Sequence, residues 1–585
     1  MSDTKYSNHY ISNLLKWVAA SYEVLGEDKF RIRAYQNAAS SIEHATSEIK
    51  DMWDEGKLKE IPGVGASIAG HLDEYFKTGK VTYFEKVLSQ MPPGMFGLFG
   101  IQGIGAKTAF KLAQDLKIKE NDNPLAIVKK AAEEGKIRAL EGFGEKKESE
   151  LLEAIDKLKP NKETRPRILL SDATEIAQRY TKHMLKCKEV KRIEPLGSLR
   201  RRLSTIGDID FAVVTSNAEV VLNHFTSFSE VAEVLNQGDI KASVLLVNGV
   251  RVDLMTEEEK AFGSLLQHFT GSKMHNVALR KVALSKGMSL SEHGIKENGK
   301  LLEFPDEESF YNHIGLKFIP PEIREDTGEL ELFEKGKKTY PNFILQSDIK
   351  GDLHSHTDFS DGQNTLEQMI KEAKTLGYSY LGISDHAPSV KTRGLDEVLR
   401  IVKDTKKIIE QQNSSDDSIR VLYGYEVNIL ADETISLPDE VLKHLDYAIG
   451  SIHTSFDQDK KTITRRLVNA INNPYINFIA HPSGRLLNQR DAYEVDWEEV
   501  FKACLEKNKI IEINSHPERL DLPDVLVREA IKKGVRLIIN TDAHSIEDFS
   551  LMRYGIDIAR RGWAEPKNVV NTLPLKDFLK EFLLH

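Results

Sequence analysis

Residues 351–362 read GDLHSHTDFSDG, and this stretch opens a series of histidines and acidic residues that decides the fold of the last two-fifths of the chain. His354 and His356 are two residues apart, as are Asp542 and His544, so each pair points to one face of an extended strand. Several members follow short apolar runs such as YLGIS, YAIGS and RLIIN, which are typical of buried parallel strands. The complete series is His354, His356, Asp361, His386, Glu426, His453, His481, Asp542 and His544.

The placement of these residues at strand ends predicts a metal site at the mouth of a barrel. The strand signals alternate with amphipathic stretches at 365–378 and 396–412, as a parallel α/β fold requires. In such a barrel, residues at the carboxyl ends of the strands converge on one mouth. Imidazoles and carboxylates together suit divalent cations such as Zn²⁺ or Mn²⁺. One such histidine alone is more commonly an ordinary core or surface residue, but nine residues in one placement favour a multinuclear site.

Composition restricts the class of protein. At 585 residues the chain is long enough for several domains, and its formal net charge of −10 argues against a uniformly basic nucleic-acid coat. A local basic track remains compatible with this charge, because acidic metal ligands contribute to the sum. Two distant cysteines, Cys187 and Cys504, exclude a disulfide framework or a cysteine-based zinc finger and favour a reducing compartment. The sequence has no secretory leader and no membrane-spanning run, so we expect a cytoplasmic protein.

The first 160 residues have an all-helical pattern interrupted by glycine-containing hairpins. Gly63 and Gly65 belong to the first hairpin, Gly103 and Gly105 to the second, and residues 140–144 (LEGFG) to a third. Glycines permit tight turns and close approach, and the helix that follows offers free N–H groups to a phosphate oxygen. A single hairpin would be an ordinary helix end, but three at intervals of roughly 40 residues favour a repeated helix-hairpin-helix unit that holds a DNA backbone without reading bases.

The middle of the chain contains a second group of acidic residues, within a mixed α/β pattern. Asp208 and Asp210 lie in residues 194–214 (EPLGSLRRRLSTIGDIDFAVV), and Asp253 lies in a later β-rich run. Oxygen-only ligands suit Mg²⁺, and two such ions can promote phosphoryl transfer. Residues 197–201 (GSLRR) supply backbone, hydroxyl and guanidinium donors for a triphosphate. An isolated DxD pair would be a solvated strand edge, whereas this combination favours a nucleotidyl-transfer site.

With these motifs the chain resembles a bacterial family X DNA polymerase that carries a polymerase-and-histidinol-phosphatase (PHP) domain. The first two-thirds are similar to DNA polymerase beta, since GSLRR, GDID, RVDLM and HFTGSKMHNVALR occur in the expected order, and the last third is similar to PHP phosphoesterases. The resemblance implies a multidomain fold with an all-α helix-hairpin-helix region, an α/β nucleotidyltransferase palm and thumb, and a distorted (β/α)7 PHP barrel. The implied boundaries are 1–90 for the N-terminal domain, 91–160 for a DNA-gripping subdomain, 161–260 for the palm, 261–325 for the thumb, 326–346 for an exposed linker and 347–575 for the barrel.

The resemblance also implies residue roles. Asp208, Asp210 and Asp253 would hold two catalytic Mg²⁺ ions, with Asp253 as the base near the primer hydroxyl. The implied contacts to the nucleotide and the nascent pair are Arg167, Gly197, Ser198, Arg201, Phe269, Gly271, Asn276 and Arg280. In the barrel, three ions would be held by His354, His356, Glu426 and Asp542; by Glu426, His453 and His481; and by Asp361, His386 and His544.

Some positions depart from the family pattern. His71 stands where DNA polymerase beta has its Schiff-base lysine, and an imidazole cannot form that imine, so we expect weak or absent lyase activity. Arg31 and Arg33 would still hold a 5′-phosphate. His268 replaces the tyrosine of a Tyr-Phe pair, and Met255 replaces an arginine beyond the catalytic aspartate.

The expected function is a monomeric repair enzyme of the bacterial cytoplasm and nucleoid that fills short gaps with dNTPs and trims 3′ ends with a Mn²⁺- or Zn²⁺-dependent 3′-5′ exonuclease. Gapped or 3′-recessed DNA would be its partner. One alternative is a DNA-end-binding nuclease with an inactive palm, and another is a small-molecule phosphatase such as a histidinol phosphatase. Arg485, Arg519, His516 and Glu512 are weaker candidates for phosphate contacts, and Lys273 and His275 for template contacts.

Overall fold

The computed structural model describes residues 8–43, 49, 53, 58–61, 63–92, 94–99, 104–119, 124–140, 143–158 and 167–582. The chain divides into two compact units, Met1–Pro166 and Arg167–His585. Among the residues described, no helix combines the length and the apolar character that a bilayer span requires.

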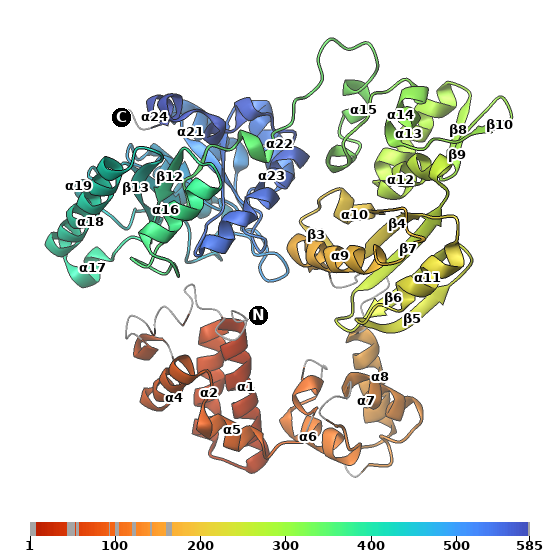
Figure 1. Cartoon of the computed structure of the whole chain (residues 1–585). Coiled ribbons are helices and arrows are strands. Elements are labelled where there is room, and N and C mark those ends of the chain that lie inside the picture. Colours follow the sequence, from red (N-terminus) through yellow and green to blue (C-terminus); the bar gives the residue numbers. More distant parts are fainter. Residues whose placement is uncertain are drawn as a thin grey trace. The chain divides into compact units, whose positions relative to one another are not determined.

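The first unit is helical throughout its described part (Figure 1). Its elements are α1 (Asn8–Leu25), α2 (Lys29–Glu43), η2 (Leu58–Glu60), α4 (Ala66–Thr78), α5 (Thr82–Leu88), η3 (Phe96–Leu98), α6 (Ala106–Asp115), α7 (Pro124–Glu133) and α8 (Glu145–Leu158). Two separate hydrophobic clusters hold these helices together. One contains Leu15, Tyr22 and Leu72, and the other contains Leu112 and Val128.

The second unit begins with a five-stranded sheet in the order β2-β4-β7-β6-β5. Its strands are β2 (Arg192–Pro195), β4 (Ile209–Val214), β5 (Val231–Gln237), β6 (Lys241–Leu246) and β7 (Arg251–Glu257). The central strands β4 and β7 run parallel, and the other neighbours are antiparallel. Helices α9 (Leu170–Met184) and α11 (Ala218–Thr226) accompany the sheet, and the short α10 (Gly197–Arg200) lies between β2 and β4 in sequence.

A thumb follows this palm. It contains α12 (Phe262–Thr270), α13 (Lys273–Ser285), the antiparallel strands β8 (Met288–Ser291), β9 (Gly294–Glu297) and β10 (Lys300–Leu302), α14 (Glu307–Ile314) and η5 (Pro321–Ile323). The segment 326–346 was expected to be an exposed linker, and most of its residues are exposed, but some of its apolar residues are buried. It forms α15 (Glu329–Leu332), and Leu330, Phe333 and Phe343 join the thumb core together with the distant Trp563, because their apolar side chains find partners there.

The C-terminal part, coloured green to blue in Figure 1, is a barrel of seven parallel strands. These strands neighbour one another in chain order. They are β11 (Gly351–Asp352), β12 (Tyr380–Ile383), β13 (Arg420–Asn428), β14 (Tyr447–Ser451), β15 (Phe478–Ile479), β16 (Ile510–Asn514) and β17 (Arg536–Asn540). A parallel bridge between Ser355 and Ala543 joins the first and last edges and nearly closes the barrel. The connecting helices include α16 (Leu366–Thr375), α18 (Leu395–Ser415), α20 (Lys460–Asn472), α21 (Trp497–Lys507), α22 (Asp524–Lys533) and α23 (Met552–Arg561).

The palm and the barrel share one hydrophobic cluster. It extends from Leu170 and Phe211 in the palm to Ile383, Leu467 and Ile539 in the barrel. The predicted multidomain fold, with helical, palm-and-thumb and barrel parts, is therefore confirmed.

Candidate functional site

The predicted metal ligands of the barrel lie at or just beyond the carboxyl ends of its strands. His354 and His356 follow β11, His386 follows β12, and Glu426 is near the end of β13. His453, His481 and the pair Asp542 and His544 follow β14, β15 and β17. Since parallel strands end at one edge, residues separated by almost 200 positions meet at one mouth.

The ligand atoms form three groups, in each of which they lie within 4.8 Å of one another. The groups are His354, His356 and Asp542; His356, Asp361, His386 and His544; and Glu426, His453 and His481. His356 thus belongs to two groups. The structure brings all nine predicted residues together, and their role as ligands stays a prediction.

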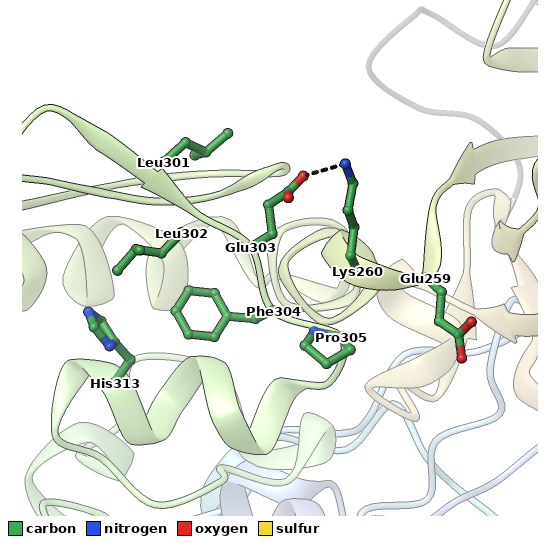
Figure 2. Close-up of a pocket in the computed structure, with 8 residues that line it drawn as sticks. All are labelled: Glu259, Lys260, Leu301, Leu302, Glu303, Phe304, Pro305 and His313. Carbon is green, nitrogen blue, oxygen red and sulfur yellow. Dashed lines mark ion pairs between the residues drawn. The ribbon is translucent and has the colours of Figure 1, made fainter.

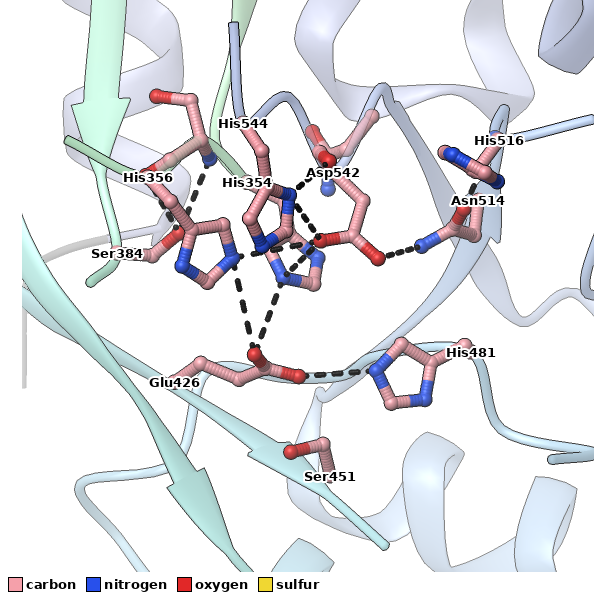
Figure 3. Close-up of polar contacts among 12 residues, drawn as sticks. His354, His356, Ser384, Glu426, Ser451, His481, Asn514, His516, Asp542 and His544 are labelled. Atoms are coloured by element: carbon pink, nitrogen blue, oxygen red, sulfur yellow. Dashed lines mark hydrogen bonds and ion pairs between the residues drawn. The ribbon is translucent and has the colours of Figure 1, made fainter. Parts of the chain in front are cut away.

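Glu426 is at the centre of these groups. Its Oε1 lies 2.9 Å from His481 Nε2 and 3.2 Å from His453 Nε2, and its Oε2 lies 3.2 Å from His386 Nδ1. The same Oε2 is 3.6 Å from His354 Nε2 (Figure 3). One buried carboxylate therefore faces ligands of all three groups and is placed to bridge cations.

Several buried imidazole nitrogens fit metal binding. His354 Nε2, both ring nitrogens of His356 and His481 Nδ1 are buried without a hydrogen-bond partner among the described residues. A buried nitrogen with no hydrogen bond is costly unless another ligand satisfies it. Since these nitrogens belong to rings that surround Glu426 and Asp542, the nitrogen and oxygen donor set fits divalent cations such as Zn²⁺ or Mn²⁺.

The histidines and carboxylates at the mouth of the barrel shift one another's pKa values strongly. Burial opposes protonation of His386, but Glu426 and Asp361 raise its pKa to about 9. Burial likewise opposes protonation of His544, and Asp361 raises its pKa to about 10. Burial alone would raise the pKa of Asp542, but His354 and other cationic neighbours hold that pKa well below its usual range. The carboxylates are therefore charged and available to a cation at neutral pH.

A supporting carboxylate lies beneath the ligands. Glu512 is fully buried on β16; its Oε1 accepts a hydrogen bond from His354 Nδ1 at 2.8 Å, and its Oε2 accepts one from the His481 N–H at 2.8 Å. Glu512 was a weaker candidate for a phosphate contact; instead, its carboxylate is fully buried and its oxygens are occupied by His354 and His481, a position suited to orienting these residues. Asp385 was not predicted; it accepts hydrogen bonds from Thr357 N–H and Oγ1, at 2.7 and 2.8 Å, between two ligand loops. Its position next to the predicted ligand His386, in the sequence SDHAP, could have indicated that Asp385 belongs to the site.

Arg519 supplies positive charge at the mouth. Its Nε lies 3.4 Å from Asp542 Oδ2, and its side chain is partly exposed. Arg485 donates from Nε to the Arg519 carbonyl at 2.9 Å, so it fixes the loop that carries Arg519. Arg519 can therefore approach a phosphate group, whereas Arg485 has a structural contact.

In the palm, strand register places the acidic residues side by side. Asp210 on β4 is paired in register with Asp253 on β7, and Asp208 lies in the chain just before β4. Arg251 pairs with Asp253 Oδ1 at 2.9 Å. The three side chains are not among the described groups whose ligand atoms lie within 4.8 Å of one another.

The backbone of Gly197 passes very close to the carboxylate of Asp210. Its φ is +56°, and a Cβ there would lie 2.7 Å from Asp210 Oδ2. Gly197 begins α10, which carries Ser198. The glycine therefore allows the backbone to approach the acidic pair closely.

Other predicted nucleotide contacts have partners within the protein. Arg201 donates to the Thr270 carbonyl and pairs with Glu325, and Arg167 Nε donates to Thr205 Oγ1 at 2.7 Å. Arg200, which the sequence offered as a triphosphate donor, instead pairs with Glu307 at 2.6 Å.

In the thumb, Asn276 accepts from Gln267 Nε2 at 2.8 Å and donates to the His268 carbonyl, Phe269 is half-buried, and Arg280 is exposed. Gly271 lies against the Arg201 guanidinium. His275 was a candidate template contact, and this is wrong, because it is fully buried between Glu329 and Tyr311.

Both glycines of the first hairpin, Gly63 and Gly65, are among the described residues. Gly63 has a φ of +81°, and a Cβ there would lie 3.1 Å from the Ala38 nitrogen. Gly65 and Gly105 precede α4 and α6 as N-caps, while Gly103 lies outside the described residues. The two exposed helix starts are available to phosphate oxygens.

His71 lies in an aromatic cluster of the first unit. Its Nδ1 is 2.9 Å from Tyr35 Oη, its ring stacks on Tyr83 at 5.2 Å, and burial lowers its pKa. Arg31 donates to Tyr83 Oη at 2.7 Å, and Arg33 is exposed. The described surroundings therefore give His71 a neutral, stacked role at neutral pH.

A surface cavity of about 840 Å³ lies on the thumb (Figure 2). It is lined by Glu259, Lys260, Leu301, Leu302, Glu303, Phe304, Pro305 and His313. Lys260 pairs with Glu303 at 3.4 Å across its rim. None of the predicted site residues lines this cavity.

Comparison with known proteins agrees with this arrangement. A helix-hairpin-helix domain matches residues 7–81, a DNA polymerase beta thumb matches residues 265–325, and a PHP domain matches residues 352–516. The DNA polymerase/3′-5′ exonuclease PolX of Bacillus subtilis (strain 168) is 34% identical over 579 residues, which cover 97% of this chain and 99% of that protein.

Relatives that cover a smaller part of the chain also match. A probable phosphatase of Caldicellulosiruptor saccharolyticus is 32% identical over 256 residues, which cover 40% of this chain and 97% of that protein. One of Thermoanaerobacter sp. (strain X514) is 29% identical over 244 residues, 39% of this chain and 94% of that protein. Among these three proteins, only the PolX protein covers nearly the whole chain. The chain belongs to the bacterial family X DNA polymerases that carry a C-terminal PHP domain.

Proposed function

We propose that this protein fills short gaps in DNA by template-directed nucleotide addition and trims 3′ ends with a metal-dependent 3′-5′ exonuclease. The observation that carries the proposal is the presence of two chemically different sites in one chain. An oxygen-only group lies across β4 and β7, and an imidazole-rich group lies at the mouth of the barrel. The Bacillus subtilis relative that spans the whole chain is named for both activities.

In the palm, Asp208, Asp210 and Asp253 would hold two Mg²⁺ ions, which neutralise triphosphate charge and favour in-line attack when bound. Asp253 would accept the proton of the primer 3′-hydroxyl, and release from Arg251 would free its Oδ1 for this role. Ser198, Arg201 and Arg167 would orient the triphosphate, and Asn276 and Arg280 would contact the nascent pair and the template.

In the barrel, the nine ligands would hold three ions, Mn²⁺ or Zn²⁺, which polarise the scissile phosphodiester when bound. Glu512 would keep His354 in the tautomer that presents Nε2 to the site. Arg519 would attract the phosphate and stabilise the charge that develops on it. We propose gapped or 3′-recessed DNA as the substrate, a monomer as the active species, and action on the nucleoid in the bacterial cytoplasm.

A pair of variants separates the two sites. Asp210→Ala is expected to abolish primer extension, by at least about 10³-fold, and to leave degradation of the same labelled gapped duplex within about twofold of wild type. His356→Ala is expected to do the reverse, because it removes a residue common to two ligand groups. Equal loss of both activities in either variant would contradict the two-site proposal. A wild-type enzyme that degrades the duplex but never extends it would favour a nuclease with an inactive palm.

A second candidate for the barrel is a small-molecule phosphatase, since relatives that match about two-fifths of the chain are named probable phosphatases. Hydrolysis of histidinol phosphate and of a 3′-recessed duplex by the same preparation distinguishes the two. We expect the duplex to be preferred, because the chain joins this barrel to a palm and to helix hairpins.

A further inference from the structure

One carboxylate between the palm and the barrel is shared by two arginines. Glu325, at the end of the thumb, lies 3.1 Å from Arg201 Nε and 3.2 Å from Arg561 Nη1. Arg201 follows α10 in the palm, and Arg561 ends α23 of the barrel. The side chains of Arg201 and Arg561 are only 13% and 8% exposed, so solvent screens these contacts weakly.

Arg561 is fixed by further contacts. Its Nη2 lies 2.6 Å from Asp524 at the start of α22. Its Nη1 donates to the Arg201 carbonyl at 2.8 Å and to the Glu322 carbonyl at 3.1 Å. A barrel side chain therefore holds both the backbone of Arg201 and the carboxylate that pairs with its guanidinium.

Because Glu325 pairs with both Arg201 and Arg561, it binds the Arg201 guanidinium less firmly. In its present contacts, the Arg201 guanidinium pairs with Glu325 and donates to the Thr270 carbonyl. To reach a triphosphate it must exchange Glu325 for a phosphate oxygen. A carboxylate that is already neutralised by a second arginine attracts the first one less strongly, so Arg561 reduces the cost of that exchange.

A second barrel residue makes a similar contact. Asn488 Nδ2 donates to the carbonyl of Arg167 at 2.7 Å. The backbones of both arginines expected to contact the triphosphate are thus held by side chains of the barrel.

We propose that Arg561 of the nuclease barrel is a positioning residue for the nucleotide site of the palm: by sharing Glu325, it allows the Arg201 guanidinium to turn to the triphosphate. This inference rests on the proposed polymerase function.

The test is single-nucleotide insertion on a gapped duplex by the full chain, with KM for the dNTP and kcat measured separately. Arg561→Ala is expected to raise KM about five- to tenfold with kcat within about twofold, because Glu325 then pairs with Arg201 alone. The double variant Arg561→Ala with Glu325→Gln is expected to return KM to within about twofold of wild type, because the competing carboxylate charge is gone.

The matched control is Arg560→Ala. Arg560 lies on the same helix and crosses the same interface to Glu322 and to the Ile344 carbonyl, but it has no contact with Arg201 or Glu325 among those found. Its KM is expected to match wild type. An unchanged KM in Arg561→Ala, an equal rise in Arg560→Ala, or a double variant worse than Arg561→Ala would overturn the proposal. A wild-type chain that inserts no nucleotide would instead overturn the polymerase function and this inference with it.

Discussion

At the scale of single residues, the approach of Gly197 to Asp210 gives a direct test of the palm. The Gly197→Ala substitution would place a Cβ 2.7 Å from Asp210 Oδ2 at a φ of +56°. We expect primer extension to fall by at least about 10²-fold and stability to fall by about 1–2 kcal/mol, since the backbone or the carboxylate must move. Insertion rates and thermal unfolding measure the two effects.

Gly249→Ala is the matched control for this substitution. Gly249 also has a positive φ of +80°, but no atom lies within 4 Å of a Cβ built there. It should show a similar backbone cost with extension close to wild type. If both variants lost extension equally, the contact with Asp210 would not be the cause.

Glu512 gives a second prediction at this scale. Glu512→Gln keeps the shape but replaces one acceptor oxygen with a donor that faces His354 Nδ1 or the His481 N–H. We expect about a 10- to 100-fold loss of metal affinity, measured by titration of Mn²⁺ into metal-stripped protein. Glu506→Gln, an exposed change on α21 in the same barrel, should leave affinity unchanged. Wild-type affinity in Glu512→Gln would contradict the orienting role.

At the scale of elements, the loops that follow the barrel strands set the pH dependence of metal binding. In metal-free protein, His386 and His544 have pKa values of about 9 and about 10, so both are protonated at pH 7. A cation must displace these protons, and we expect affinity to rise about tenfold per pH unit for each displaced proton between pH 7 and 9. Isothermal titration in buffers of different ionisation enthalpy would count the released protons. A pH-independent affinity would contradict this assignment.

The same shifts have a consequence for stability. Because both folded-state pKa values lie above the usual value of an unfolded histidine, the stabilisation from these charge pairs is complete below about pH 6.5 and is lost as pH rises through 9 and 10. Metal-stripped protein should therefore melt at progressively lower temperature over that range.

The elements also show what the sequence could predict. The barrel ligands could be predicted because several of them follow short apolar runs, and parallel topology brings strand ends together whatever their separation. The proximity of Asp210 and Asp253 could also be predicted, because both lie in β-rich runs of the palm. The burial of Glu512 could not be predicted from its position in a strand, because it becomes evident only when the neighbouring strands are known. The burial of Leu330, Phe333 and Phe343 within the segment 326–346 could not be predicted, because charged residues surround them and some of their partners are distant in sequence.

At the scale of the whole molecule, contacts between the palm and the barrel could not be predicted. Arg561 and Glu325 are 236 positions apart, and no local pattern links them. Their pairing depends on how α23 packs against the end of the thumb, which is a property of the folded second unit alone. Interfaces of this kind hold polar residues whose partners only the tertiary structure reveals.

The hydrophobic cluster that includes Leu170 and Phe211 as well as Ile383 and Ile539 ties the thermal behaviour of the two halves together. A core that belongs to both cannot melt in one and survive intact in the other. A mutation that destabilises either the palm or the barrel is therefore expected to reduce the amount of folded protein. Mutations in the palm would then also reduce the amount of active barrel.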